Sequence, residues 1–466
     1  MAGASGHPDL TELRRSVAGA VIAATDSGYD QARRSYNALI DRRPAAIVRC
    51  RLAGDVAVAL DFARSEGLEV AVRGGGHNPA GHCMVADGLV IDLSLMRSVE
   101  VDHEARIAYA EGGATWLNFD AATQAFGLVT PGGVVGTTGV AGLTFGGGIG
   151  HLTAQHGLTC DHLLGAEVVT PDGSIVRASA DEDSELLWGL RGGGGNFGVA
   201  TRLEFRLFPL ERVLGGRLIY TGRHVGEALR RYRDLVAASP RDLSCGALLS
   251  VDESLEPILI VSPCYTGASA DPQELKELRS APGLIDDGLR VHSFIAQQHV
   301  FNPPYGEERC YWKGHFVREL SDELIDELLE RMVALGRPPG QLLIESLHGA
   351  AKDNDASLGA VGFRGAAFNL SAMAGWMDPT DDEDHIEWAR ETAAAIAPWS
   401  ASGAGYVNYM QADEPIERVR AAFGDETFER LRTLKGRYDP ENVLRRNQNI
   451  PPHPAEPGVP AQEATS

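Results

Sequence analysis

One stretch of the chain, LEVAVRGGGHN at 68–78, carries residue types that could approach and hold a phosphate. It begins with an apolar, β-branched run that is typical of a buried strand. The polar end consists of Arg73, Gly74, Gly75, Gly76, His77 and Asn78. Glycines can turn their N–H groups toward an anion, arginine adds a planar cation, and histidine adds an imidazole at the end of the loop. An ordinary structural turn is the alternative on these residues alone.

A second unusual segment, TPGGVVGTTGVAGLTFGGGIGH at 130–151, is rich in glycine but interleaved with apolar residues. That composition predicts neither a regular helix nor a regular strand. We interpret the segment as a buried backbone wall around a large flat ligand. Tight packing of a strand against a helix through glycine is the alternative.

The overall composition is that of a globular protein with an acidic surface. The 466 residues carry 42 basic and 64 acidic side chains, a formal net charge of −22. Such a surface repels nucleic acid and anionic membranes, so we exclude both as principal partners. The six cysteines are scattered, without a CxxC pair, which argues against a metal site and against a disulfide framework.

The N-terminal region shows no targeting signal. The apolar stretch 17–24 is short, follows Arg14 and Arg15, and predicts a helix rather than a signal peptide. No apolar run is long enough to span a bilayer. We therefore expect a cytoplasmic protein.

The segment 40–210, preceded by helices over 1–39, predicts an α+β domain. Strands are expected at 46–50, 68–72, 89–93 and 107–110, helices at 54–66 and 116–126, and a hairpin at 164–177. A GxGxxG pattern at Gly193, Gly195 and Gly198 follows a predicted helix and opens the strand 199–207. Because a Rossmann fingerprint follows a strand and opens a helix, we reject an NAD site.

Residues 211–403 alternate strands with helices and predict an antiparallel sheet covered by helices on one side. In the C-terminal segment 404–452, Tyr406, Asn408 and Tyr409 lie on a strand-like stretch, with Tyr406 and Asn408 facing one way and Tyr409 the other. The tail 453–466 is rich in proline, alanine and glutamate, and we expect it to be disordered.

Together these landmarks resemble the berberine-bridge-enzyme-like FAD-linked oxidases of the vanillyl-alcohol-oxidase superfamily, whose FAD-binding domain is of the PCMH type. The matching motifs are RGGGHN at 73–78, TTGVAGL at 137–143 with the glycines of 146–150, GLTCD at 157–161, GGGGNFGV at 192–199, YVNY at 406–409, YDPEN at 438–442 and NQNIP at 447–451. Residues 211–403 match in style only. The resemblance implies a PCMH-type domain of two α+β subdomains, completed by 404–452, beside a substrate domain at 211–403.

The resemblance also implies FAD attached through His77 to the 8α-methyl group of the flavin. Members with a second link carry a cysteine where this chain has Val135, so we expect a single link. Cys160 comes too late in the pattern, and a buried inert thiol is its expected fate. Flavin contacts are implied at Arg73, Gly74, Gly75, Gly76, His77, Asn78, Thr137, Thr138, Gly139, Ala141, Gly142, Leu143, Gly146, Gly147, Gly148, Gly150, His151, Asp161, Val199, Asn408 and Asn447.

The family's catalytic tyrosine falls on Tyr409, with Tyr406 as a second catalytic position. A tyrosine with a pKa of about 10 needs a nearby cation or hydrogen-bond donor to act as a base. Thr138, beside the flavin, leaves room for molecular oxygen, so we favour an oxidase that releases hydrogen peroxide.

Its substrate would be a small alcohol, phenol, amine or sugar, and we expect a role in secondary-metabolite tailoring. A sugar oxidase, a dehydrogenase with another acceptor and a flavin-bearing binding protein are the alternatives. We expect a monomer or a homodimer.

Overall fold

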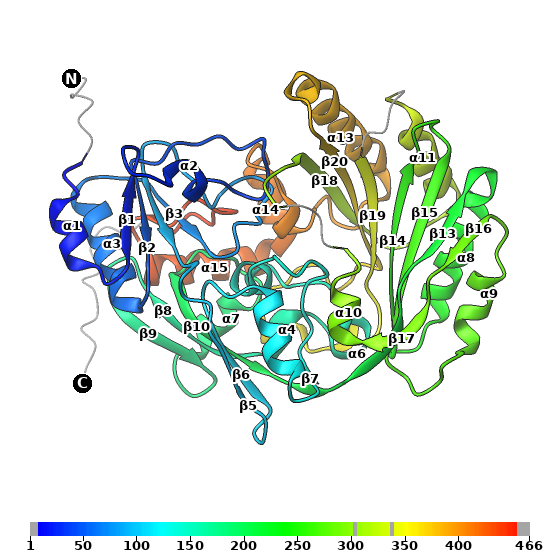
Figure 1. The fold of residues 1–466 in the computed structure, drawn as a ribbon, viewed down its shortest axis with the longest axis horizontal. Coiled ribbons are helices and arrows are strands. Elements are labelled where there is room, and N and C mark those ends of the chain that lie inside the picture. Colours follow the sequence, from blue (N-terminus) through cyan, green and yellow to red (C-terminus); the bar gives the residue numbers. More distant parts are fainter. Residues whose placement is uncertain (1–7, 302–304, 336–339, 454–466) are drawn as a thin grey trace.

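The computed structural model describes residues 8–301, 305–335 and 340–453. Two bodies of secondary structure lie side by side, one built by the N-terminal part of the chain and the other by its middle (Figure 1). The C-terminal helices α14 (Ile416–Phe423) and α15 (Asp425–Tyr438) return to the N-terminal body, where α15 contacts α7 (Ser184–Leu190). Among the residues that the structure describes, no helix is long and apolar enough to cross a bilayer.

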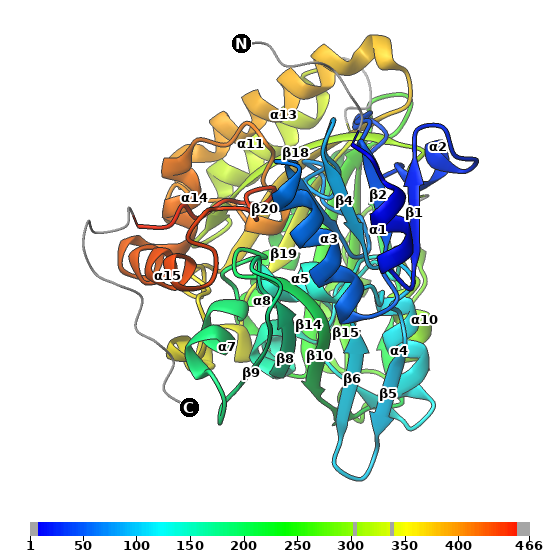
Figure 2. The same cartoon turned by 90° about the vertical axis from the view of Figure 1, so that its left-hand side faces the viewer.

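The N-terminal body contains two main sheets. The first has the order β1-β2-β4-β3, with β1 (Ala20–Ala23), β2 (Ala46–Arg49), β4 (Leu89–Asp92) and β3 (Val70–Arg73). The second is antiparallel, with β5 (Val99–Asp102), β6 (Ile107–Glu111), β10 (Val199–Arg206), β8 (Leu163–Val169) and β9 (Ile175–Ser179) in that order. Helices α1 (Thr11–Ser16) and α3 (Ala53–Ser65) pack together on the side turned toward the viewer in Figure 2. The α+β prediction is confirmed.

The middle of the chain forms a nine-stranded antiparallel sheet. Its main path is β16 (Leu284–Asp287), β13 (Leu218–Thr221), β15 (Pro257–Tyr265), β14 (Leu243–Val251), β19 (Gly340–Ser346), β20 (Phe368–Trp376) and β18 (Arg309–Val317), with β12 (Arg212–Gly215) and β17 (Arg290–Ser293) beside it. Helices α8 (Val225–Ala238), α11 (Asp322–Val333) and α13 (Asp382–Ile396) share one core with strand residues such as Leu249 and Leu342. Because side chains alternate along a strand, Leu248 and Leu343 lie on the uncovered face.

Short elements connect these layers. They are α2 (Tyr29–Ala32), α4 (Trp116–Gln124), β7 (Leu128–Val129), α5 (Val140–Phe145), α6 (Thr153–His156), β11 (Phe208–Pro209), α9 (Lys276–Arg279), α10 (Phe294–Gln298) and α12 (Ala350–Asp353). Most predicted strands and helices appear within a few residues of their expected bounds. The domain boundaries stay predictions, and the expected disordered tail lies outside the described residues except for His453 at its start.

Three local predictions are wrong. Residues 17–24 were expected to form a helix but include the edge strand β1, which pairs antiparallel with β2. Tertiary pairing therefore overrides the local amphipathic pattern. The glycine-rich segment contains one regular helix, α5. The strand-like stretch at 406–409 is a 3₁₀ turn, Val407–Tyr409, so the expected alternation of its side chains does not apply. Strands β5, β18 and β19 were not predicted.

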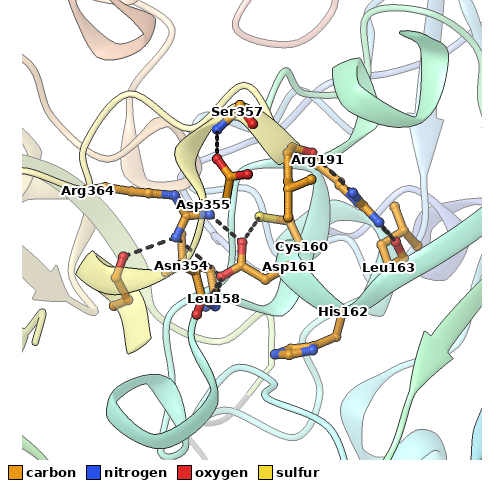
Figure 3. A network of polar contacts seen from close by, with 12 residues as sticks. Leu158, Cys160, Asp161, His162, Leu163, Arg191, Asn354, Asp355, Ser357 and Arg364 are labelled. Atoms are coloured by element: carbon orange, nitrogen blue, oxygen red, sulfur yellow. Dashed lines mark hydrogen bonds and ion pairs between the residues drawn. The ribbon is translucent and has the colours of Figure 1, made fainter. Parts of the chain in front are cut away.

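A buried ion pair joins the 3₁₀ turn Thr159–His162 to the segment after α12 (Figure 3). The Asp161 carboxylate accepts hydrogen bonds from the Arg364 guanidinium and, at 2.8 Å, from the Asn354 amide. The backbone N–H of Leu158 donates to the same carboxylate at 3.0 Å. The side chains of Arg364 and Asp161 are only 8% and 9% exposed, so this pair is shielded from solvent.

We predict that Arg364→Met destabilises the fold. Removing one partner leaves the Asp161 charge buried and unpaired, which costs about 3–5 kcal/mol. Arg241→Met is the matched control, because the ion pair of Arg241 with Asp353 is exposed and contributes about 1 kcal/mol or less. Denaturant unfolding measures both changes, and equal losses in the two variants would contradict the prediction.

Candidate functional site

A cavity of about 600 Å³ lies between the glycine-rich segments of the N-terminal body and the uncovered face of the large sheet. Most of the predicted flavin contacts line it: Gly74, Gly75, Gly76, His77, Asn78, Thr138, Gly139, Ala141, Gly142, Leu143, Gly146, Val199, Asn408 and Asn447. Tyr409 lines the same cavity. Residues from five distant parts of the chain are therefore brought to one site.

The loop after β3 is held against the glycine-rich segment by close backbone contact. A Cβ atom on Gly75 would lie 2.3 Å from the backbone nitrogen of Gly139, and one on Gly139 would lie 2.5 Å from the nitrogen of Gly75. Real side chains do not tolerate such distances, so only glycine fits at both positions. Arg73 turns away from the cavity, because its guanidinium donates to the carbonyl of Ala32 at 2.5 Å and borders a smaller neighbouring hollow that Thr137 also lines.

The His77 ring is fixed on three sides. It stacks on Tyr36 at a centroid distance of 4.2 Å, and its Nε2 lies 2.7 Å from Thr137 Oγ1. Its Nδ1 lies 3.4 Å from the hydroxyl of Thr138, which lines the cavity. Burial lowers the pKa of His77 to about 3. The imidazole is therefore neutral at physiological pH, which is the form that can act as a nucleophile.

Tyr409 has a carboxylate beside it, where we expected a cation or a hydrogen-bond donor. Its hydroxyl donates to Glu345 Oε1 at 3.2 Å, and Asn369 donates to Glu345 Oε2 at 2.7 Å. Burial raises the pKa of Glu345 to about 7. Burial and the charge of Glu345 together raise the pKa of Tyr409 well above its ordinary value. The expectation of a neighbouring cation is therefore wrong, and Tyr409 cannot be a tyrosinate at neutral pH.

Glu345 was missed by sequence reasoning. It lies on β19 in the run QLLIES, where a single acidic residue interrupts an apolar strand. An acidic side chain at a buried strand position is a recognisable signal for a site residue, because carboxylates are seldom buried without a function or a partner.

Several predicted site residues lie outside the cavity. The Tyr406 hydroxyl is buried, accepts a hydrogen bond from Gly148 N at 3.0 Å and contacts the Asn408 amide at 2.8 Å. His151 is buried beside Gln297. Asp161 belongs to the ion pair with Arg364. None of Gly147, Gly148 and Gly150 is among the cavity residues. Tyr406 therefore supports the cavity residue Asn408 and does not itself line the cavity.

The positions of Val135 and of two cysteines bear on the expectation of a single flavin link. Val135 lines the cavity, and Cys160 does not. The Cys160 thiol contacts Asp161, and burial raises its pKa well above the ordinary value, which makes it unreactive (Figure 3). Cys83 borders the cavity, but its thiol points to the carbonyl of Gly76 and burial raises its pKa as well.

The cavity walls fit a flavin dinucleotide. Gly74, Gly75 and Gly76 line the cavity without Cβ atoms, so a pyrophosphate can approach their backbone. Buried polar atoms of Arg446, Asn447 and His82 have no hydrogen-bond partner within the described protein, and all three residues border the cavity. Such groups normally bind a ligand or water.

We predict that Gly75→Ala prevents the correct placement of the His77 loop. The added Cβ meets the backbone of Gly139, which cannot move aside as a flexible side chain could. Gly436→Ala is the control, because a Cβ there meets no atom within 4 Å and alanine stabilises a helix interior by about 1 kcal/mol. Flavin content and melting temperature should fall in Gly75→Ala only; normal values for that variant would refute the packing argument.

Two protein families match parts of this chain that contribute residues to the cavity. Residues 44–179 match a family described as FAD binding domain, and residues 405–451 match one described as berberine and berberine like. The (R)-6-hydroxynicotine oxidase of Paenarthrobacter nicotinovorans is 31% identical over 451 residues, which cover 94% of this chain and 97% of that protein. The FAD-linked oxidoreductase YgaK of Bacillus subtilis, described as uncharacterized, is 28% identical over 448 residues, covering 94% and 98%.

Solved structures show the same relationship. The crystal structure of 6-hydroxy-D-nicotine oxidase from Arthrobacter nicotinovorans superimposes with a TM-score of 0.86 at 29% identity, covering 96% of this chain and 99% of that one. A xylooligosaccharide oxidase from Myceliophthora thermophila shares the fold, with a TM-score of 0.81 at 20% identity and coverage of 94% and 98%. The chain therefore belongs to the berberine-bridge-enzyme-like family of FAD-linked oxidoreductases, as an FAD-dependent oxidase.

Proposed function

We propose that this oxidase carries FAD on a single covalent link to His77 and oxidises a small organic substrate, with Tyr409 and Glu345 together removing the proton. The observation that carries the proposal is the hydrogen bond from the Tyr409 hydroxyl to the buried Glu345 carboxylate, at the edge of the cavity that His77 also lines. When bound, FAD accepts a hydride from the substrate and is reoxidised by molecular oxygen to give hydrogen peroxide.

Glu345 explains how a tyrosine with a raised pKa can serve as a base. Tyr409 faces the cavity, whereas Glu345 lies behind it and is not a cavity residue. A substrate O–H or N–H can donate to the Tyr409 hydroxyl while that hydroxyl passes its own proton to Glu345, so tyrosinate never forms. A carboxylate with a pKa of about 7 is suited to accept a proton at neutral pH.

The neutral, stacked imidazole of His77 supports the covalent link. The Thr137 hydroxyl is within hydrogen-bond distance of His77 Nε2. The other ring nitrogen, Nδ1, is the one nearer to Thr138, which lines the cavity. The aliphatic Val135 supports one link, because no sulfur stands at that position. The small side chain of Thr138 supports access of molecular oxygen, and the cytoplasmic location and the monomeric or dimeric state remain predictions.

The alternatives differ from this proposal in specific observations. A binding protein without turnover has no need for a buried carboxylate hydrogen-bonded to a cavity tyrosine. A dehydrogenase would need a separate acceptor, so oxygen consumption by the substrate-reduced protein distinguishes it from an oxidase. A sugar oxidase would differ from this proposal only in its substrate, which depends on the cavity walls at the large sheet.

We predict that His77→Ala abolishes flavin fluorescence on a denaturing gel, whereas the wild type shows a fluorescent band. Non-covalent FAD should remain in the native variant, because the glycine walls are unchanged. Peptide mass spectrometry should find flavin on the His77 peptide alone. Equal fluorescence in both proteins, or flavin on a Cys83 or Cys160 peptide, would end the single-link proposal.

Tyr409→Phe removes one hydroxyl and keeps the ring that packs against Trp312 and Tyr406. Flavin reduction by substrate should slow by about 10²–10⁴-fold, the usual range for a positioned proton-transfer group. Flavin attachment should survive. Anaerobic stopped-flow bleaching measures the step, with Tyr406→Phe as the comparison: a larger loss in Tyr406→Phe would transfer the role to that residue.

The rate of flavin reduction should rise with pH through about 7 and reach a plateau above it, because Glu345 must be ionised to accept a proton and burial raises its pKa to about 7. In Glu345→Gln the amide cannot accept the proton, so this rise should vanish and the rate should be low at every pH. A wild-type profile that is flat between pH 5.5 and about 8.5 would argue against Glu345 as the acceptor.

A further inference from the structure

The uncovered face of the large sheet has an apolar floor where it meets the cavity. Ile260, Leu248 and Leu343 form one cross-strand row over β15, β14 and β19. Met373 and Trp312 are paired neighbours on β20 and β18. All five residues line the cavity. Side chains this large and apolar would contact the body of the substrate.

The polar groups at this end are few, and their positions are informative. Leu343 and Glu345 lie two residues apart on β19, so they share a face and the floor begins beside the proton acceptor. Gln341 and Arg217 also line the cavity, but both are exposed, which places them toward solvent. A bound molecule therefore meets the Tyr409 hydroxyl, which is backed by Glu345, next to a mainly apolar floor with exposed polar side chains at its edge.

We propose that the substrate is a hydrophobic ring compound with one ionisable O–H or N–H beside the reacting C–H, and that polyhydroxylated sugars are poor substrates. The proposal rests on the proposed function. A sugar carries a hydroxyl on nearly every ring carbon, and each hydroxyl placed over the apolar floor would lose its hydrogen bonds to water without a replacement. An apolar ring instead gains by burial on the same floor.

The test compares two compounds with the same reacting group. 2-Hydroxytetrahydropyran and D-xylopyranose share a six-membered lactol ring, and xylose adds three hydroxyls. In both, the anomeric C–H would lose a hydride to the flavin and the adjacent O–H would lose its proton, giving a lactone and reduced flavin. Anaerobic bleaching of the holoenzyme should be at least 100-fold more efficient with 2-hydroxytetrahydropyran, and equal or better bleaching by xylose would overturn the proposal.

Binding provides a readout that does not depend on turnover. Phenol, cyclohexanol and inositol are titrated into the oxidised holoenzyme while the flavin absorption spectrum is recorded. The first two should perturb the spectrum at concentrations at least tenfold lower than inositol. Tighter binding of inositol, or binding of neither phenol nor cyclohexanol, overturns the substrate class. Loss of bleaching in Tyr409→Phe with retained phenol binding would separate this proposal from the proton-transfer proposal.

Substitutions in the apolar floor test whether its side chains bind the ring of the substrate. Leu343→Asn and Leu248→Asn should each weaken phenol binding at least tenfold while keeping the covalent flavin. Ile285→Asn is the control, because Ile285 on β16 is 65% exposed and outside the cavity. Unchanged phenol binding in both floor variants would contradict the assignment.

The end of the cavity away from the apolar floor carries a positive charge. Arg446 lines the cavity, donates to the carbonyl of Met84 at 3.1 Å and keeps a buried Nε without an acceptor. Arg42 donates to the same carbonyl at 3.0 Å, so the two guanidinium groups lie side by side. Within the described chain, neither forms an ion pair with a carboxylate, and Glu69 is paired with Arg445 instead.

His82 beside them also borders the cavity, and neither of its ring nitrogens has a partner among the described residues. Burial and the two arginines lower its pKa to about 4, so it adds no compensating or further charge. Two adjacent cations without a counter-ion repel each other, and an anionic ligand would remove that repulsion. The cluster is close to the glycine loop, because Cys83, the neighbour of Met84, contacts the carbonyl of Gly76.

We infer that Arg446, supported by Arg42, would bind the FAD pyrophosphate together with the backbone of the glycine loop. The test uses the His77→Ala protein, which holds FAD without a covalent link, and follows FAD release on dilution by the rise of flavin fluorescence. Adding Arg446→Leu should weaken FAD binding at least 30-fold and reduce its salt dependence. Adding Arg445→Leu, the exposed neighbour paired with Glu69, should change it less than twofold.

The result separates a charge contact from general support of the fold. Arg446→Lys should restore much of the FAD affinity, because the cation is kept. Equal FAD affinity in the Arg446→Leu and Arg445→Leu proteins would overturn the inference. An unchanged salt dependence in Arg446→Leu, or failure of Arg446→Lys to restore binding, would do the same by assigning Arg446 a packing role.

Discussion

The contact between Gly75 and Gly139 is the constraint on which the site depends. Two glycine-rich segments pass each other with their backbones closer than any side chain would allow. That contact places the β3 loop against the start of α5 and brings Thr137 and Thr138 to the two nitrogens of His77. The ring that we assign to flavin attachment is therefore positioned by backbone packing and by the stacking of Tyr36.

Proton removal depends on a contact between two distant parts of the chain. Glu345 comes from a central strand of the large sheet, whereas Tyr409 comes from the C-terminal segment. Burial favours the protonated carboxyl and raises its pKa, and the hydrogen bonds from Tyr409 and Asn369 oppose that shift by stabilising the carboxylate. The resulting pKa of about 7 lets one residue be ionised before the reaction and protonated after it.

The two ends of the cavity have opposite chemistry. The end beside the glycine loop carries the Arg446 guanidinium, with Arg42 beside it, whereas the end beside the large sheet carries an apolar floor and the Tyr409 hydroxyl, with the Glu345 carboxylate behind it. The chain as a whole has a net charge of −22, and Arg446 nevertheless lines the cavity without a carboxylate partner among the described residues. Such a division would favour a flavin cofactor with its phosphates at one end and its reacting ring at the other.

The sequence by itself determined the local features. The strand before RGGGHN, the helix at 54–66, the hairpin at 164–177 and the rejection of an NAD fingerprint follow from periodicity and turn chemistry, which act between near neighbours. The motifs also identified the family, and most of the flavin contacts that they implied line the cavity. Only the tertiary structure decided that residues 20–23 form a strand, because its partner β2 lies elsewhere in the chain. It likewise decided that Tyr406 faces the protein interior and that Tyr409 meets Glu345, since a contact across 64 residues depends on the packing of the sheet and leaves no periodic signal in the sequence.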